Sequence, residues 1–149
     1  MRGALKEWAI VVDSLGRGEQ ILILRKGGIH DGPDGFSIEH PRFLLFPTAF
    51  HQQREKVIES AGRRIGRGSP DSAASGGVRI EYFAEVILGH QLKSLADAER
   101  LRGQHLWLDE VISERFRWGR EPGIFALALR VYRLRKAAEL PMHAYYAGC

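Results

Sequence analysis

The sequence predicts a single α+β domain, in which a mixed or antiparallel sheet of about four to six strands packs with three or four helices. Apolar runs of strand length recur along the whole chain, and segments with helical spacing and capping residues lie between them. The 149 residues contain no internal repeat and no second composition class. Because a chain of this length has the size of one ordinary domain, we assign residues 1–149 to a single domain.

The composition is that of a soluble globular protein, because 44% of the residues are hydrophobic and 27% are charged. A formal charge of +4 and a pI of about 9.5 permit an anionic partner such as nucleic acid or a nucleotide. The single cysteine, Cys149, cannot form an internal disulfide. Lys6 and Glu7 interrupt any signal-peptide hydrophobic region, and no apolar run approaches the ~20 residues of a membrane helix. These features predict a cytoplasmic protein without a membrane partner.

Two short apolar runs near the N-terminus predict a β-hairpin. The run Trp8–Val12 (WAIVV) is β-branched and aromatic, and Gln20–Leu24 (QILIL) is a second run of strand length. Leu15–Gly18 (LGRG) supplies a glycine turn between them, so the two strands are expected to pair antiparallel. Both runs are apolar nearly throughout, which predicts a central position with both faces covered.

The segment after the second run, Arg25-Lys26-Gly27-Gly28, allows two interpretations. Two cations followed by two glycines can place positive charge and backbone N–H groups around a phosphate. A strand also commonly ends in charged residues and a glycine turn, and this is the simpler account. Arg25 and Lys26 are nevertheless candidate phosphate-binding residues.

A loop and a third apolar run come next. His30–Gly35 (HDGPDG) is dense in glycine, proline and aspartate and is expected to be a loop, followed by a short edge strand over Phe36–Glu39. Phe43–Phe46 (FLLF) is the third apolar run. Pro47 is expected to end it.

A helix over about residues 50–61 is predicted, with Thr48 as its N-cap. His51 and Glu55 stand four residues apart and therefore share a face of this helix. Together with Glu59 they are the candidate catalytic residues, because imidazole and carboxylates can hold Mg²⁺ or Mn²⁺ and orient a water. The alternative is an exposed His–Glu pair on a solvated helix.

Further along, residues 62–77 are rich in glycine and serine and predict a flexible loop, whose arginines can contact phosphates. Val78–Leu88 alternates apolar and polar residues and predicts a strand with one buried face. Ser94–Leu101 predicts a short helix, in which Ser94 is the N-cap and Asp97 stands at the reciprocal capping position.

The C-terminal third has one ambiguous element. His105–Leu108 (HLWL) predicts a brief strand, and Asp109 is expected to cap a helix that continues to about Trp118. Phe125–Leu134 (FALALRVYRL) alternates as a strand does, but its alanine and leucine content favours a helix. Four apolar residues there also have helical spacing: Ile124, Leu127, Val131 and Leu134. We therefore favour the helix.

Candidate phosphate- or nucleic-acid-binding residues are polar side chains at the ends of the predicted elements and on the basic C-terminal element. They are Arg25, Lys26, Thr48, Gln52, Arg130 and Arg133. If the protein has a chemical site, we expect the junction over residues 47–52 to line it, with Arg25 or Lys26 nearby.

Several blocks of the chain carry a family resemblance. The N-terminal third contains ALKEW, ILILRKGGI and EHPRFLLFPTAFHQ, and HLWLDEVISERFRWG and FALALRVYRL follow later. In this order they resemble an uncharacterised prokaryotic family, domain-of-unknown-function family 1802, over almost the whole chain. Some members of that family are joined to a restriction-endonuclease-type domain. The resemblance therefore implies a role linked to restriction–modification.

A looser likeness is to Nudix hydrolases. In that family a strand similar to ILILRKGG precedes a loop and a helix with metal-binding glutamates, and a segment similar to HLWLDEV leads into a later helix. Arg54-Glu55 and Glu59 stand in roughly the corresponding order. This likeness implies a Nudix-like fold and a phosphohydrolase that uses Mg²⁺ or Mn²⁺.

Three functions stay open. The leading hypothesis is an accessory protein that binds nucleic acid or a nucleotide and is linked to restriction–modification or defence. The enzyme hypothesis is a metal-dependent, Nudix-like phosphohydrolase. The third is an interaction module, in which residues around Trp107, Phe116 and Trp118 contact a partner or a second copy in a homodimer. The chain contains no Walker A loop, no paired-cysteine zinc pattern and no Gly-x-Ser-x-Gly elbow that would decide among them.

Overall fold

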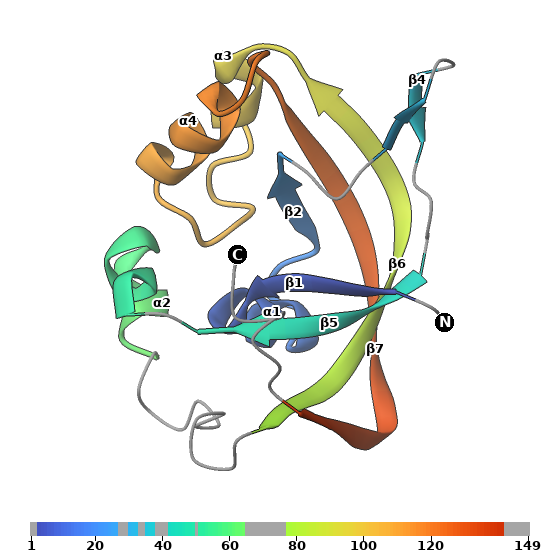
Figure 1. Ribbon diagram of the computed structural model, residues 1–149. Helices are drawn as coiled ribbons and strands as arrows, with labels where there is room; N and C mark the ends of the chain where they lie inside the picture. The colour runs from blue at the N-terminus through green and yellow to red at the C-terminus, as the bar shows by residue number, and fades with distance from the viewer. Residues whose placement is uncertain are drawn as a thin grey trace.

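The computed structural model describes residues 3–26, 30–32, 35–37, 42–49, 51–64 and 77–141. A curved five-stranded sheet with the strand order β1-β5-β6-β7-β2 dominates it (Figure 1). Its strands are β1 (Ala4–Trp8), β2 (Leu22–Arg25), β5 (Arg42–Thr48), β6 (Gly77–Leu92) and β7 (Ile124–Pro141). β1 and β5 are parallel, whereas the other neighbouring pairs are antiparallel. The sheet is therefore mixed.

The described residues also form four α-helices, one 3-10 helix and a separate two-stranded sheet. The helices are α1 (Ala9–Gly16), η1 (His51–Lys56, the 3-10 helix), α2 (Glu59–Gly62), α3 (Leu95–Glu99) and α4 (Asp109–Arg117). The small sheet pairs β3 (His30–Gly32) with β4 (Gly35–Ser37). This architecture confirms the predicted α+β class. In the part of the chain that is described, no helix combines the length and apolarity needed to cross a membrane.

The curvature of the sheet comes from its two longest strands. β6 and β7 have 16 and 18 residues and pair antiparallel, with register shifts between Ile80 and Tyr82 and between Val86 and Leu88. Such irregularities bend a strand and increase its twist. Figure 1 shows both strands curving around one side of the molecule, so that the two edge strands, β1 and β2, lie on the same side of them.

The predicted N-terminal hairpin is wrong. The strand β1 ends at Trp8, the run Ala9–Val12 begins α1, and β1 and β2 stand at opposite edges of the sheet. The β-branched residues of this run favour a strand locally. In α1, however, Ile10, Val11 and Val12 are all buried. Burial of these side chains outweighs the small helix-propensity cost of β-branched residues.

The helix favoured for Phe125–Leu134 is also wrong. This segment lies inside β7 and pairs with β6 in register. Its alternation was the better guide, because Leu127 and Leu129 are buried while Arg130 is exposed. The predicted loop His30–Gly35 likewise contributes β3 and the first residue of β4. In both places, pairing with a neighbouring strand decides the structure.

Pro47 does not end β5, which continues to Thr48. The pairing of β5 with β6 ends at Leu44, and beyond it β5 pairs only with β1. The missing N–H of Pro47 therefore interrupts no ladder hydrogen bond on the β6 side.

The predicted helix over residues 50–61 is divided into η1 and α2. Between them Val57 forms a β-bridge with Trp107, and the Ile58 N–H donates to the Leu106 carbonyl at 2.8 Å. These bonds to a distant segment replace the helical ones, so the expected α-helical spacing of His51, Glu55 and Glu59 is lost.

Several other predictions are confirmed. Gln20–Leu24 overlaps β2, and Val78–Leu88 lies within β6. Ser94 caps α3, because its Oγ accepts a hydrogen bond from the Asp97 N–H at 3.1 Å. The helix after residue 108 is present, although Asp109 is its first residue and not its cap. Residues 65–76 of the predicted loop lie outside the described part of the chain.

The core fills the space between the sheet and helices α1 and α4. Its fully buried side chains include Ile23 and Leu24 from β2, Leu45 from β5, and Trp107 from the segment before α4. A smaller apolar cluster, formed by Phe46, Val78 and Ile80 with their neighbours, lies where β6 passes β5. β2 is thus held by the core although only one of its edges is paired.

One close contact in this core makes a test possible. A Cβ atom at Gly16 would clash with the ring of Tyr82, and Cζ would be its nearest atom. The substitution Gly16→Ala should therefore lower the free energy of unfolding by about 1–3 kcal/mol, although alanine is ordinarily the better helix former. Urea unfolding followed by tryptophan fluorescence measures the change. In a Tyr82→Leu background the same substitution should cost much less, and an equal cost in both backgrounds would show that the ring contact is not the cause.

Candidate functional site at the seam of the sheet

Arginine side chains bind the open edges of the two edge strands of the sheet. Arg25 of β2 donates from Nη1 to the backbone carbonyl of Lys6 in β1 at 2.6 Å. Arg115 of α4 donates from Nη1 to the backbone carbonyl of Leu24 in β2 at 2.8 Å. Each edge strand therefore has a carbonyl group bonded to a guanidinium where a neighbouring strand would otherwise bind. We call this region the seam.

A cavity of about 180 Å³ lies at the seam. It is lined by Lys6, Glu7, Trp8, Leu24, Arg25, Lys26, Thr48 and Arg115. β1, β2, the end of β5 and α4 all contribute to this wall. Residues from four separate parts of the chain thus meet at one place, which we call the seam cavity.

Glu7 is the acidic member of the seam cavity. Its side chain is 3% exposed, its Oε1 accepts from the Trp8 N–H at 2.9 Å, and its Oε2 lies 3.7 Å from Nη1 of Arg25. The Thr48 hydroxyl donates to the Glu7 carbonyl at 3.2 Å. A buried carboxylate needs such a cationic partner, because charge without compensation is costly in the interior.

Arg115 forms a stacked wall with two tryptophans. Its guanidinium carbon lies 5.2 Å from the ring centroid of Trp8 and 4.6 Å from that of Trp107. The two indole rings meet edge to face at 6.4 Å. The two distances from the guanidinium to the rings are within the range of cation–π attraction. Arg115 therefore holds a fixed positive charge beside the cavity.

Lys26 fixes the end of α4. Its Nζ donates to the carbonyls of Phe116 at 3.0 Å, Glu121 at 2.6 Å and Gly123 at 2.8 Å. Burial lowers the pKa of Lys26, and the Glu121 carboxylate opposes that change. Because an ammonium group has three donors, these bonds use all of them. Lys26 contributes charge to the seam cavity, while its N–H groups bind the protein itself.

The seam cavity is therefore electropositive. Four cationic side chains line it around one carboxylate, which is itself paired with Arg25. The indole of Trp8 and the side chain of Leu24 supply apolar surface beside these charges. Such a wall suits a ligand with an anionic group and a flat apolar part.

Three of the sequence-predicted binding residues, Arg25, Lys26 and Thr48, line the seam cavity together. Thr48 does so as the end of β5 and not as the predicted helix cap. The side chains of His51 and Gln52 lie outside the part of the structure that is described.

The other predicted residues lie elsewhere. Glu55 and Glu59 are exposed, and Glu59 pairs with Arg63. The described residues contain no group of three or more His, Cys, Asp or Glu side chains placed to hold a metal. Arg130 and Arg133 are exposed on β7 and do not line the seam cavity. The catalytic and metal roles stay predictions.

Sequence reasoning missed five of the eight residues that line the cavity. Lys6 and Glu7 were considered only as an interruption of a signal-peptide region, Trp8 and Leu24 as residues of the expected hairpin, and Arg115 as part of the helix expected after Asp109. The sequence carries no clear signal for Glu7, because its burial and its pairing with Arg25 are visible only in the structure.

Behind the tryptophan wall lies His105, which is 6% exposed. Its ring centroid is 5.5 Å from that of Trp107. Burial lowers the pKa of His105, and Arg115 and Arg102 lower it further, against the opposing effects of Asp109 and the Trp107 backbone. The neutral imidazole is therefore favoured in the folded protein.

Comparison with known proteins gives a family and a fold. A family model described as "Domain of unknown function (DUF1802)" matches residues 4–149. The crystal structure of ASCH from Zymomonas mobilis is similar, with a TM-score of 0.52 and 11% identity, over 93% of this chain and 72% of that chain. At this identity the likeness concerns the fold alone, and it lends no support to the looser Nudix likeness. No curated protein matches.

The Arg25–Glu7 pair predicts a specific loss of stability. Arg25→Met removes the partner of a buried carboxylate and should lower the free energy of unfolding by about 3 kcal/mol. In a Glu7→Gln background the cost should fall to about 1 kcal/mol, because no charge is left without compensation. Urea unfolding of the four proteins measures both values. The control is Arg100→Met, whose side chain is 82% exposed. Equal costs in both backgrounds would exclude the pairing as the source.

His105 predicts a dependence of stability on pH. Its pKa is lower in the folded than in the unfolded state, so the unfolded chain binds the proton first as the pH falls below about 6.5. The free energy of unfolding should therefore decrease between about pH 7.5 and about pH 5.5. The variant His105→Gln should show a smaller decrease, while His90→Gln, at an exposed position, should behave as the wild type. Identical pH profiles for all three proteins would contradict this.

Proposed function

The chain belongs to the family described as "Domain of unknown function (DUF1802)", and we propose that it binds nucleic acid by holding one phosphate-bearing nucleotide of a strand in the seam cavity. The observation that carries this proposal is the meeting of four cationic side chains with Trp8 and Thr48 between two sheet edges. A phosphate has the charge that this wall attracts, and a base or sugar can lie against the indole.

The strength of the attraction between the seam cavity and a phosphate depends on where the charges lie. Charges in a partly enclosed cavity are screened less by water than charges on an open surface. Arg25 and Arg115 are held by hydrogen bonds to backbone carbonyls, and Arg115 also by two indole rings. Because these side chains are already ordered, a ligand pays little conformational entropy to arrange them.

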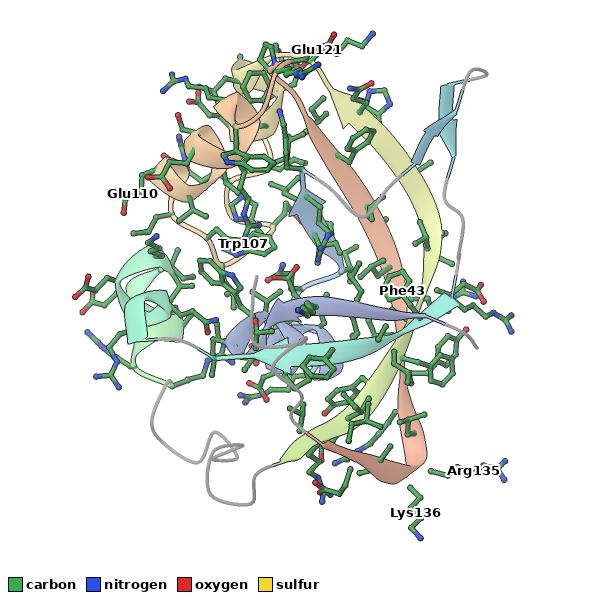
Figure 2. All side chains as sticks on the ribbon, viewed as in Figure 1. Phe43, Trp107, Glu110, Glu121, Arg135 and Lys136 are labelled. Carbon is green, nitrogen blue, oxygen red and sulfur yellow. The ribbon has the colours of Figure 1, made fainter. Side chains whose placement is uncertain are left out.

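Two features favour a strand of nucleic acid over a free nucleotide. The seam cavity, at about 180 Å³, is smaller than the ~300–1,000 Å³ of pockets that enclose a drug-sized ligand. A nucleotide held there therefore extends out of it. Exposed cations on β7 offer a second contact to an extended ligand: Arg130, Arg133, Arg135 and Lys136. Figure 2 shows Arg135 and Lys136 pointing away from the far end of the β6–β7 pair.

Single strands fit this arrangement better than duplexes. An unpaired base is free to lie on an aromatic ring, and such stacking is tolerant of sequence. We further propose that the protein acts in the cytoplasm, in an accessory role in restriction–modification or defence. It follows from the family resemblance and from the class of ligand.

Fluorescence anisotropy with labelled single-stranded DNA and RNA of about ten nucleotides tests the proposal. Binding should weaken steeply between about 50 mM and about 200 mM salt, because phosphate contacts release counterions. Lys6→Met should weaken binding about tenfold and reduce the salt slope by about one. The matched control is Lys93→Met, which removes the same charge at an exposed position away from the cavity.

Two results would overturn the proposal. One is the absence of binding at micromolar protein in low salt. The other is equal weakening by the two substitutions, which would assign binding to net charge and not to the seam cavity.

A further inference from the structure

A second cavity, of about 450 Å³, lies behind the tryptophan wall. Its lining comes from the segment after α1, from α2 and its approach, and from the segment before α4. The residues are Glu19, Gln20, Ile58, Ser60, Arg64, Arg102, Gly103, Gln104, His105, Leu106 and Trp107. Figure 2 shows Trp107 between the helices α2 and α4. None of these residues lines the seam cavity.

Three buried side chains of the second cavity have polar atoms without a hydrogen-bond partner among the described residues. They are Oε1 of Gln20, Nδ1 of His105 and Nε1 of Trp107. The exposed fractions of these residues are 3%, 6% and 2%. Buried polar atoms are nearly always bonded in folded proteins, and here three of them, from two distant segments, line one cavity.

The chemical character of these atoms is defined. The Nε2 of Gln20 donates to the Leu22 carbonyl at 2.7 Å, which fixes Oε1 as an acceptor. The indole Nε1–H of Trp107 is a donor only. The imidazole Nδ1 of His105 can serve in either role, and burial lowers the pKa of this ring, which favours its neutral form. The side chains that line the cavity therefore carry a donor, an acceptor and a group that can be either, and these three atoms are themselves closed to solvent.

The charges around the second cavity are already compensated. Arg64 pairs with Glu19 at 2.7 Å, and Arg102 pairs with Asp109 at 2.7 Å. The charged residues of the lining are Glu19, Arg64 and Arg102, and Asp109 beside the cavity compensates the remaining positive charge. An uncharged ligand with both hydrogen-bond donors and acceptors matches it better than an anion does.

The volume of the second cavity favours such a ligand over ordered water molecules. One water occupies about 30 Å³ of liquid volume, so a cavity of about 450 Å³ exceeds what three polar atoms can order as single waters. Its volume is within the range of ligand pockets. The rings of His105 and Trp107, inclined at 42° to each other, give it an aromatic flank.

We propose that the second cavity binds an uncharged nucleobase. The choice of a base among polar uncharged rings rests on the proposed function, because a strand held at the seam supplies one. The two cavities lie at opposite ends of one stack of side chains: Trp8 and Arg115 line the seam cavity, and Trp107 lines the second. A base taken out of a strand is commonly read by hydrogen bonds to its edge within such a pocket.

Nuclear magnetic resonance of the nitrogen-15-labelled protein tests this inference with the four nucleosides uridine, cytidine, adenosine and guanosine, which carry no phosphate. The chain has three tryptophans, and Trp8→Phe and Trp118→Phe identify the Trp107 indole resonance by elimination. At least one nucleoside should shift the Trp107 indole resonance in a saturable manner. Absence of a shift with all four, or a shift confined to Trp8, would overturn the inference.

A matched pair of variants locates the site. Gln20→Met removes the acceptor and should weaken the nucleoside affinity about tenfold, whereas Gln91→Met makes the same change at a half-buried position of β6 that lines neither cavity and should leave it unchanged. His105→Phe serves as a second variant if Gln20→Met does not fold. Equal affinities in the wild type and in the buried-site variant would overturn the inference.

The two proposals fail separately. Salt-dependent strand binding without any nucleoside effect on Trp107 would leave the seam function standing and refute the base site. A saturable shift of the Trp107 indole resonance without strand binding would refute the seam function and leave the base site standing.

Discussion

The five-stranded sheet leaves two edge strands facing the same region, and their carbonyl groups need hydrogen-bond donors. Strand pairing would meet this need in a closed barrel. In this protein the guanidinium groups of Arg25 and Arg115 meet it, at Lys6 and Leu24 respectively. The positive charge of the candidate site is therefore a consequence of how the sheet is held at its seam.

The bonds to the sheet edges also fix the orientation of the cationic side chains at the seam. Cationic side chains recruited for backbone carbonyls cannot reorient freely, and Arg115 is further confined by Trp8 and Trp107. Fixed charge interacts with an incoming anion without prior reorganisation. The buried Glu7 compensates only part of that charge, since it is one carboxylate, paired with Arg25, in a wall that holds four cationic side chains. The site thus remains attractive to an anion while each of its elements stays folded.

Much of the fold could be read from local pattern. The apolar run of β2, the alternation of β6 and the Ser94 cap all depend on neighbouring residues, and sequence reasoning found them. The parallel pairing of β1 with β5 and the bridge between Val57 and Trp107 depend on contacts across the chain. These contacts turned an expected hairpin into a strand and a helix, and divided an expected helix. They carry no periodic signal in the sequence.

The candidate site was predictable to the same extent. Arg25, Lys26 and Thr48 stand at the ends of apolar runs, where polar residues are conspicuous, and they do meet at the seam cavity. Glu7 and Arg115 could not be assigned from pattern, because Arg25, which pairs with Glu7, and the Leu24 carbonyl, which Arg115 binds, are both distant along the chain. Their roles depend on which strands become edges, and that is decided by the whole sheet.

Lys26 also determines how this region can open. Its ammonium group joins the end of β2 to the last turn of α4 and to the segment before β7. Fraying of the helix end and detachment of the edge strand therefore require the same three bonds to break. Local unfolding free energies are shared within such a unit. Amide hydrogens in β2 and at the end of α4 should accordingly exchange with solvent as one cooperative group, although the two segments are about ninety residues apart in sequence.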